Sequence, residues 1–288
     1  MNTLQITQSI MRKNKIFAKK SFGQNFLVDD NILESIVINS NVGQDDLVIE
    51  IGPGLGNLTA YILETGAKVI AFEIDNDMID ILNARFNGNE KLEIQNIDIL
   101  KVDLNDYIKE VKGNVRVIAN LPYYITTPII FKLLEYKDKI ASITVMVQKE
   151  VADRIASEPG SKEYGILTIN TNYQADVEKL FNVPNTSFIP APSVISSVIK
   201  ITPNKEKERA LGIKDGKIFE ELVKKAFSER RKKMANSLAN CGLCGLTKIE
   251  IEEIIKNVDL KETVRAEEVS VEMFAKLANE IAHIVKNR

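Results

Sequence analysis

The stretch "LVIEIGPGLGNLTAYILETGAKVIAFEID" (47–75) decides the fold of this chain. Its first apolar run, 47–52, and the run 67–75 are rich in Val and Ile, which predicts two buried strands. Between them, "NLTAYILETG" has the apolar spacing of a helix, and Gly66 is expected to close it as the C′ residue. A strand, a glycine-rich turn, a helix and a second strand predict a βαβ unit with parallel strands.

The same alternation continues along the chain. Further buried strands are predicted at 92–98, 115–120 and 142–148, with helical patterns between them. Two later runs, around 173–183 and 194–201, resemble a closing hairpin. Strands that alternate with helices predict an α/β fold, in which a mostly parallel sheet is covered on both faces.

Composition shifts suggest three segments. Residues 1–20 look like a mobile basic arm, and 21–203 hold the α/β pattern. A polar stretch at 202–217 looks like a linker, and 204–288 then read as a small α-helical domain. Within this domain, the run "IFEELVKKAFSERRKKMANSLA" is expected to be one helix.

The composition excludes several classes of protein. The chain has 288 residues, 44% apolar and 27% charged, which is the balance of an ordinary globular protein. No apolar run approaches the roughly 18 residues of a membrane span, and the first 20 residues contain no signal-peptide core. We therefore expect a cytoplasmic protein, acting as a monomer. Cys241 and Cys244 form one C-x-x-C that does not follow a strand, so neither a metal site nor a redox pair is expected.

The charge is unevenly distributed, although the net charge is only −2. The segment 12–20 carries five cations and no acid, and 224–233 carries six cations and one acid. A charge run alone is most often a solvated surface, so the second segment needs other support before it indicates nucleic-acid binding. If RNA is the partner, the candidate contacts are Lys225, Arg230, Arg231 and Lys232.

Acidic side chains stand at the carboxyl ends of three successive predicted strands, beside the glycines of "EIGPGLGN" (50–57). Gly52 opens a G-x-G-x-G turn in which the backbone can approach a ligand closely. Glu50 would repel a pyrophosphate but suits an ammonium group. Glu73 stands where an acid binds ribose hydroxyls, and Asp98 can accept from an adenine amine. Because open α/β sheets bind ligands at this edge, S-adenosylmethionine fits best, with NAD as the alternative.

The fourth strand ends in "NLPYY" (120–124), at the same edge. Two acceptors on the hydrogens of an adenine amine free its lone pair for attack on a methyl group. The side chain of Asn120 and the carbonyl of Leu121 can supply them, with Pro122 fixing the peptide direction. Tyr123 offers a flat face on which an extruded base can stack. The pattern therefore predicts methyl transfer to an adenine amine, in which catalysis is mostly positioning.

With these motifs, the chain resembles the KsgA (RsmA) family of ribosomal RNA adenine dimethyltransferases, which are relatives of the Erm methylases. The likeness covers nearly the whole length, through "GQNFL", "VIEIGPGLGNLT", "FEID", "NID", "NLPYYITTPI", "FNVPNTSFIPAPSV" and "FSERRKKMANSL". It implies a Rossmann-like class I S-adenosylmethionine-dependent methyltransferase domain followed by a small helical domain. It also implies that the cofactor site is lined by Asn25, Leu27, Gly52, Glu73, Asp98 and Asn120.

The implied substrate is small-subunit (16S) ribosomal RNA, in which two adjacent adenosines near the 3′ end become dimethyladenosines during ribosome biogenesis. One departure concerns the RNA side: the family usually has Lys-Val-Asp-Ser where this chain has Ser193-Val194-Ile195-Ser196. The segment "FNVPNTSF" offers two aromatics, Phe181 and Phe188, and we expect Phe188 to form the second face of a base sandwich.

Three alternatives stay open at this point. An Erm-like enzyme acting on large-subunit RNA is disfavoured by the long "FSERRKKMANSL" region. An RNA-binding assembly factor with a vestigial pocket is disfavoured by the intact Glu73, Asn120, Pro122 and Tyr123. A DNA adenine methylase would be expected to carry its own duplex-reading domain, and none is evident.

Overall fold

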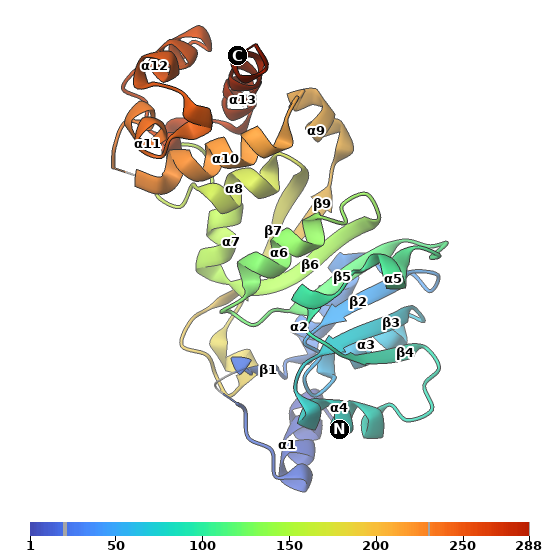
Figure 1. Cartoon of the computed structure of the whole chain (residues 1–288). Helices are drawn as coiled ribbons and strands as arrows, with labels where there is room; N and C mark the ends of the chain where they lie inside the picture. The colour runs from blue at the N-terminus through green and yellow to red at the C-terminus, as the bar shows by residue number, and fades with distance from the viewer. Residues whose placement is uncertain (20–21, 230, 288) are drawn as a thin grey trace. The chain divides into compact units, whose positions relative to one another are not determined.

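The central sheet is built from the predicted strands. They are β2 (Leu47–Ile51), β3 (Lys68–Glu73), β4 (Leu92–Asn96), β5 (Val115–Asn120), β6 (Ile140–Gln148), β7 (Ala175–Val183) and β9 (Ser196–Pro203). In this computed structural model, which describes residues 1–19, 22–229 and 231–287, they form one sheet in the order β4-β3-β2-β5-β6-β9-β7 (Figure 1). Neighbours from β4 to β6 run parallel and β9 is antiparallel to β6, so the predicted α/β sheet is confirmed.

Helices cover the sheet because its strands are apolar on both sides. Every residue of β2 is buried. The helices α2 (Asp30–Ser40) and α3 (Asn57–Glu64) supply Leu33, Ile36, Leu58 and Ile62 to a core cluster that also holds Val48 and Val69 of the sheet. The remaining helices of this region are α4 (Asn76–Arg85), α5 (Asn105–Ile108), α6 (Thr126–Leu134) and α7 (Lys149–Ile155).

The predicted mobile arm at the N-terminus is instead a helix, α1 (Thr3–Asn14). Asn2 caps it in a capping box with Gln5, which satisfies amides that would otherwise lack a partner. Thr7 is fully buried, and its Oγ1 accepts a 2.8 Å hydrogen bond from Nδ2 of Asn57. A buried polar contact with α3 fixes this segment, and the charge run concealed it because the contact lies 50 residues away in sequence.

The chain divides into two compact units at other positions than predicted. The first comprises Met1–Ala152 and Glu178–Pro203, and the second comprises Asp153–Val177 and the residues from Asn204 onward. The segment 153–177, which holds α8 (Ile166–Asn172), falls within the predicted sheet domain 21–203. In the structure it belongs to the second unit instead. The reason is aromatic packing: the rings of Tyr173 and Phe219 lie 5.0 Å apart, and Tyr164 is buried among the same side chains.

The second unit is helical, as expected. It contains α9 (Lys205–Leu211), α10 (Gly216–Ala226), α11 (Met234–Asn240), α12 (Lys248–Asn257) and α13 (Val271–Lys286) (Figure 1). The single helix predicted across 218–239 is wrong, because a 3₁₀ turn (Phe227–Glu229) follows α10. The amide of Met234 bonds the carbonyl of Val264 at 2.8 Å instead of continuing a helix. Among the described residues, no helix is both long and apolar enough to span a bilayer.

Candidate active site

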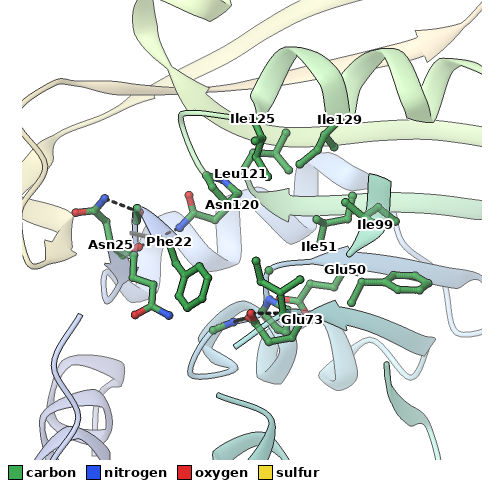
Figure 2. Close-up of a pocket in the computed structure, with 18 of the residues that line it drawn as sticks. Phe22, Asn25, Glu50, Ile51, Glu73, Ile99, Asn120, Leu121, Ile125 and Ile129 are labelled. Atoms are coloured by element: carbon green, nitrogen blue, oxygen red, sulfur yellow. Dashed lines mark hydrogen bonds between the residues drawn. The ribbon is translucent and has the colours of Figure 1, made fainter. Parts of the chain in front are cut away.

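A cavity of about 1060 Å³, including its open mouth, lies where β2, β3 and β5 end at their carboxyl edge. The opposite wall comes from the N-terminal segment 22–27, of which Phe26–Leu27 is the short strand β1. Figure 2 shows Asn25 and Asn120 close together, with Glu50 and Glu73 across the cavity from them. The cavity brings together these predicted residues: Asn25, Leu27, Gly52, Glu73, Asp98, Asn120, Leu121, Pro122 and Tyr123.

The glycine turn leaves the backbone open to a ligand. Gly52 has φ +66° and Gly54 has φ +55°, in the left-handed region that side chains rarely adopt. An added Cβ on Gly52 would meet no atom within 4 Å, so the backbone there faces free space. At Gly54 the same atom would stand 3.2 Å from the ring of Phe26. The turn is therefore both strained for other residues and accessible from the cavity.

Glu73 ends β3 with its carboxylate held by backbone amides. Oε2 accepts from the N–H of Gly54 at 3.1 Å, and Oε1 accepts from Ile74 at 2.8 Å and Asp75 at 2.9 Å. Burial raises the pKa of Glu73, and these three amides oppose that rise. The hydrogen bonds fix the carboxylate in one orientation at the cavity wall, which suits a rigid acceptor for ribose hydroxyls.

Glu50 is buried in the same wall without a complete set of partners. Its side chain is 1% exposed, and its Oε2 has no hydrogen-bond partner. Burial, with a smaller contribution from the nearby carboxylate of Glu73, raises the pKa of Glu50 to about 8, although Thr59 and Arg85 oppose the rise. An orphaned buried carboxyl oxygen is costly unless a ligand satisfies it. A cationic ligand group is what this arrangement can accept.

Asp98 follows β4 and caps the 3₁₀ turn Ile99–Lys101, with Oδ1 accepting from the amide of Leu100 at 3.0 Å. It lines the cavity beside Ile97 and Ile99, which flank it with apolar surface. The acid is thereby held at the edge where the sequence predicted an acceptor for adenine.

The catalytic motif is held by hydrogen bonds at each residue. Nδ2 of Asn120 donates to the backbone carbonyl of Asn25 at 3.1 Å. The amide of Leu121 bonds the carbonyl of Met146 at 3.1 Å, and the carbonyl of Pro122 accepts from Ile125. This contact orients the amide of Asn120, whose acceptor atom, Oδ1, is available for a substrate.

Tyr123 is half-buried, and its hydroxyl shares a 2.7 Å hydrogen bond with Oγ of the fully buried Ser196. Burial raises the pKa of Tyr123, so the phenol stays neutral at ordinary pH. The neighbouring Tyr124 is 57% exposed and also lines the cavity. The ring of Tyr123 is therefore fixed by its hydroxyl, while its face remains part of the cavity.

Phe188 is not at the cavity. It is 4% exposed, belongs to β8 (Phe188–Ile189) and pairs with Leu27 of β1, within the core cluster on the sheet. Phe181 packs against the same cluster. The sequence placed Phe188 in a Pro-rich loop, whereas the structure places it in a core strand, and the base-stacking face expected there stays a prediction. Aromatic faces at the cavity come instead from Phe22 and Tyr124, which sequence reasoning missed, although Phe22 directly precedes the quoted "GQNFL".

The predicted RNA contacts lie in the second unit and differ from one another. Nζ of Lys225 is 2.6 Å from Glu221 and donates to the carbonyl of Gly242. Lys232 is 2.7 Å from Glu229. Arg231 is exposed and lines a hollow with Gly160, Ser161, Lys162, Arg265 and Glu267. Arg230 lies outside the described residues. Among the described residues no cluster of three or more metal-ligating side chains occurs, and Cys241 and Cys244 are free thiols.

Comparison with known families gives a direct match. The model of the family "Ribosomal RNA adenine dimethylase" matches residues 16–283. The chain belongs to the ribosomal RNA adenine dimethylase family. The sequence-based prediction of this family, and of an S-adenosylmethionine-dependent methyltransferase, is therefore confirmed.

Individual relatives of this dimethylase are similar over nearly their whole length. The chain is 43% identical to "Ribosomal RNA small subunit methyltransferase A" of Lachnoclostridium phytofermentans, over 97% of both chains. It is 42% identical to the protein of the same name from Clostridioides difficile, over 95% of this chain and 94% of that one.

Solved structures agree on the fold. A dimethyladenosine transferase from Plasmodium falciparum superposes with a TM-score of 0.76 at 27% identity, covering 88% of this chain and 96% of that one. The 23S rRNA methyltransferase ErmE has a TM-score of 0.66 at 22% identity, covering 90% and 100%, and supports the fold alone. The predicted class I methyltransferase fold is confirmed.

Proposed function

We infer that the chain transfers methyl groups from S-adenosylmethionine to the exocyclic amines of two adjacent adenosines near the 3′ end of small-subunit (16S) ribosomal RNA, giving dimethyladenosines during ribosome biogenesis. The relatives that it matches along nearly their full length are named small-subunit methyltransferases. The observation that carries the chemistry is the Asn120 side chain, whose nitrogen is held by the Asn25 carbonyl beside an acid-lined cavity.

The cavity residues fit S-adenosylmethionine better than NAD. Glu73 is the acceptor for the ribose hydroxyls, and Asp98 is the acceptor for the adenine amine. The orphaned oxygen of Glu50 suits the cationic end of the ligand, which favours the ionised carboxylate, whereas a pyrophosphate would hold this buried group in its neutral form and gain no ion pair. Gly52 gives the backbone close access. When bound, S-adenosylmethionine supplies an electrophilic methyl group on a sulfonium.

The target adenine is activated by acceptors and not by a strong base. Oδ1 of Asn120 and the carbonyl of Leu121 accept from the two amine hydrogens, which turns the nitrogen lone pair toward the methyl group. Tyr123 stacks on the base, and base–aromatic stacking contributes about 1–3 kcal/mol. These contacts strengthen as the amine becomes tetrahedral, so they lower the barrier more than they tighten ground-state binding.

RNA docking is assigned to the second unit and the basic N-terminal segment. The exposed Arg231 stands in a hollow with Lys162 and Arg265, which supports a contact with phosphates. Arg230 and Lys232 are part of the same proposal, whereas Lys225 is ion-paired within its own helix and contributes least. The enzyme is expected to act as a monomer in the cytoplasm, where its ribosomal substrate is assembled.

Labelled methyl transfer tests the whole proposal. Small subunits lacking the modification, large subunits and duplex DNA are each incubated with the protein and radiolabelled S-adenosylmethionine, with Asn120→Ala as the matched control. Label in small-subunit RNA alone, together with a primer-extension stop at two adjacent adenosines, is the expected result. Label in large-subunit RNA would make the enzyme Erm-like. No label with any substrate would favour an assembly factor with a vestigial pocket.

A further inference from the structure

The N-terminal wall of the cavity is held by hydrogen bonds at two adjacent residues, Gln24 and Asn25. We name residues Phe22–Leu27 the strap, since they line the cavity opposite the sheet. The carbonyl of Asn25 accepts from the side-chain nitrogen of Asn120. On the preceding side, Gln24 and Lys19 donate to Asp75, which lies more than 50 residues away in sequence.

The side-chain carboxylate of Asp75 accepts the hydrogen bonds from both Lys19 and Gln24. Its side chain is only 2% exposed, yet Oδ1 accepts from Nζ of Lys19 at 2.7 Å and Oδ2 accepts from Nε2 of Gln24 at 2.7 Å. The Gln24 amide is itself oriented, because its Oε1 accepts from the backbone N–H of Lys19 at 2.8 Å. Both carboxylate oxygens are thus committed to the segment that leads into the strap.

The same residue is tied to the predicted ribose acid. The backbone N–H of Asp75 donates to Oε1 of Glu73 at 2.9 Å. Oδ1 of Asp75 also accepts from the amide of Asp77 at 3.1 Å, which caps α4. Asp75 therefore contacts the cofactor-side acid through its backbone N–H, and its buried carboxylate joins the start of α4 to the strap, which reaches Asn120 through Asn25.

We propose that Asp75 is a positioning residue, which holds the strap closed so that the cofactor wall and the amide of Asn120 are set together. This inference rests on the proposed role of Asn120. Asp75 itself does not line the cavity, so it acts through Gln24, Asn25 and Glu73. It follows that loss of the Asp75 contacts should loosen both the cofactor wall and the contact that orients the Asn120 amide.

Capping of α4 is the competing explanation for a buried Asp at this position. Asp75→Asn separates the two, because Asn is about as good an N-cap as Asp. The variant keeps an acceptor for the Asp77 amide but turns an NH₂ group toward Nε2 of Gln24, so that two donors face each other. It also removes the charge that pairs with Lys19. A change in hydrogen exchange limited to the strap would therefore reflect loss of the contacts with Gln24 and Lys19, and not loss of the α4 cap.

Asp77→Asn is the matched control. Asp77 also contacts Lys19, at 2.7 Å, but its side chain is 56% exposed and it makes no contact with Gln24. Both variants lose one carboxylate beside the same lysine, and only one of them loosens Gln24. An exposed ion pair contributes little to stability, so Asp77→Asn is expected to behave like the parent protein.

The experiment follows amide hydrogen exchange, cofactor affinity and methyl transfer in the two variants. For Asp75→Asn we expect faster exchange at residues 22–27 with exchange in α4 unchanged. The dissociation constant for S-adenosylmethionine should rise about tenfold or more, and the single-turnover rate at saturating cofactor should also fall. Lys19→Met should lower affinity too, and its effect should not multiply with that of Asp75→Asn.

Two results would overturn the inference. In the first, Asp75→Asn matches Asp77→Asn in strap exchange and cofactor affinity. In the second, exchange rises across α4 and the melting temperature falls, with affinity unchanged, as for a lost cap. The exchange and calorimetric readouts need no activity, so they stand even if Asn120→Ala were to leave methyl transfer intact and the proposed function failed.

Discussion

The side-chain nitrogen of Asn120 lies 3.1 Å from the backbone carbonyl of Asn25, and this contact joins the end of β5 to the strap. It fixes which end of the Asn120 amide faces a substrate. Asn120→Ala should therefore reduce turnover by orders of magnitude and leave the dissociation constant for S-adenosylmethionine within about tenfold, because the contact with the amine matters most in the transition state. Single-turnover methylation and calorimetry measure the two quantities, and near-normal turnover would refute the assignment.

Tyr123 provides a test of stacking against hydroxyl chemistry. Tyr123→Ala should be nearly inactive, while Tyr123→Phe should keep substantial activity because stacking needs only the ring. The Phe variant leaves the buried Oγ of Ser196 without its 2.7 Å partner, which costs about 1–3 kcal/mol of stability. Methylation assays and thermal melts distinguish these effects, with Ser196→Ala as the partner control. A Phe variant as inactive as the Ala variant would assign the hydroxyl a chemical role.

Glu73 is expected to control cofactor affinity. Glu73→Ala removes the acceptor proposed for the ribose hydroxyls, and hydrogen bonds to charged groups contribute roughly 1.5–3 kcal/mol, so the dissociation constant should rise about 10- to 150-fold. It also leaves the amides of Gly54, Ile74 and Asp75 without their acceptor. Glu73→Gln, which keeps one acceptor oxygen, should lose less. Calorimetry showing an unchanged constant would move the ribose elsewhere.

Glu50 should make the ligand-free protein sensitive to pH. Its pKa is about 8 when folded, against an ordinary value of 4.5. Between these values the folded state keeps a proton that the unfolded state has released, so the free energy of unfolding falls as pH rises, by on the order of 1 kcal/mol per pH unit. Above pH 8 both states are ionised and no further loss occurs.

Glu50→Gln removes that titration. The stability of the variant relative to the parent should increase from pH 5 to pH 8 and then level off, as measured by denaturant unfolding at each pH. Parallel pH profiles for the two proteins would mean that Glu50 is ionised throughout, with a partner that the cavity geometry does not reveal.

The basic segment after α10 should supply phosphate contacts. Replacing Arg230 and Arg231 by Ala should weaken binding to undermethylated subunits and flatten its salt dependence by about 0.7–0.9 per lost phosphate contact. Lys225→Gln is the control, because Lys225 is ion-paired with Glu221 and should matter less. Melting temperature and cofactor affinity should barely move. If the double variant binds undermethylated subunits as tightly as the parent protein at every salt concentration, this segment is only a solvated surface and does not contact RNA.

Local sequence by itself determined the sheet and its chemical edge. Apolar runs, the glycine turn at Gly52 and the acids at the carboxyl ends of β2, β3 and β4 are properties of neighbouring residues, so their spacing is sufficient to predict them. Parallel strands then bring Glu73, Asp98 and Asn120 to one edge without any further information. The family motifs added Asn25 and Leu27, and the cavity includes both.

Tertiary structure alone decided the features that depend on contacts between distant residues. Phe188 became core because β8 pairs with β1, and the segment 153–177 joined the second unit because its aromatic side chains pack there. The basic N-terminus is fixed as a helix by the buried Thr7. The strap is held by Asp75 and by Asn120, which lies 95 residues from Asn25 in sequence. Residue spacing carries no signal for such pairs, because burial and hydrogen bonding across the fold override local propensity and charge.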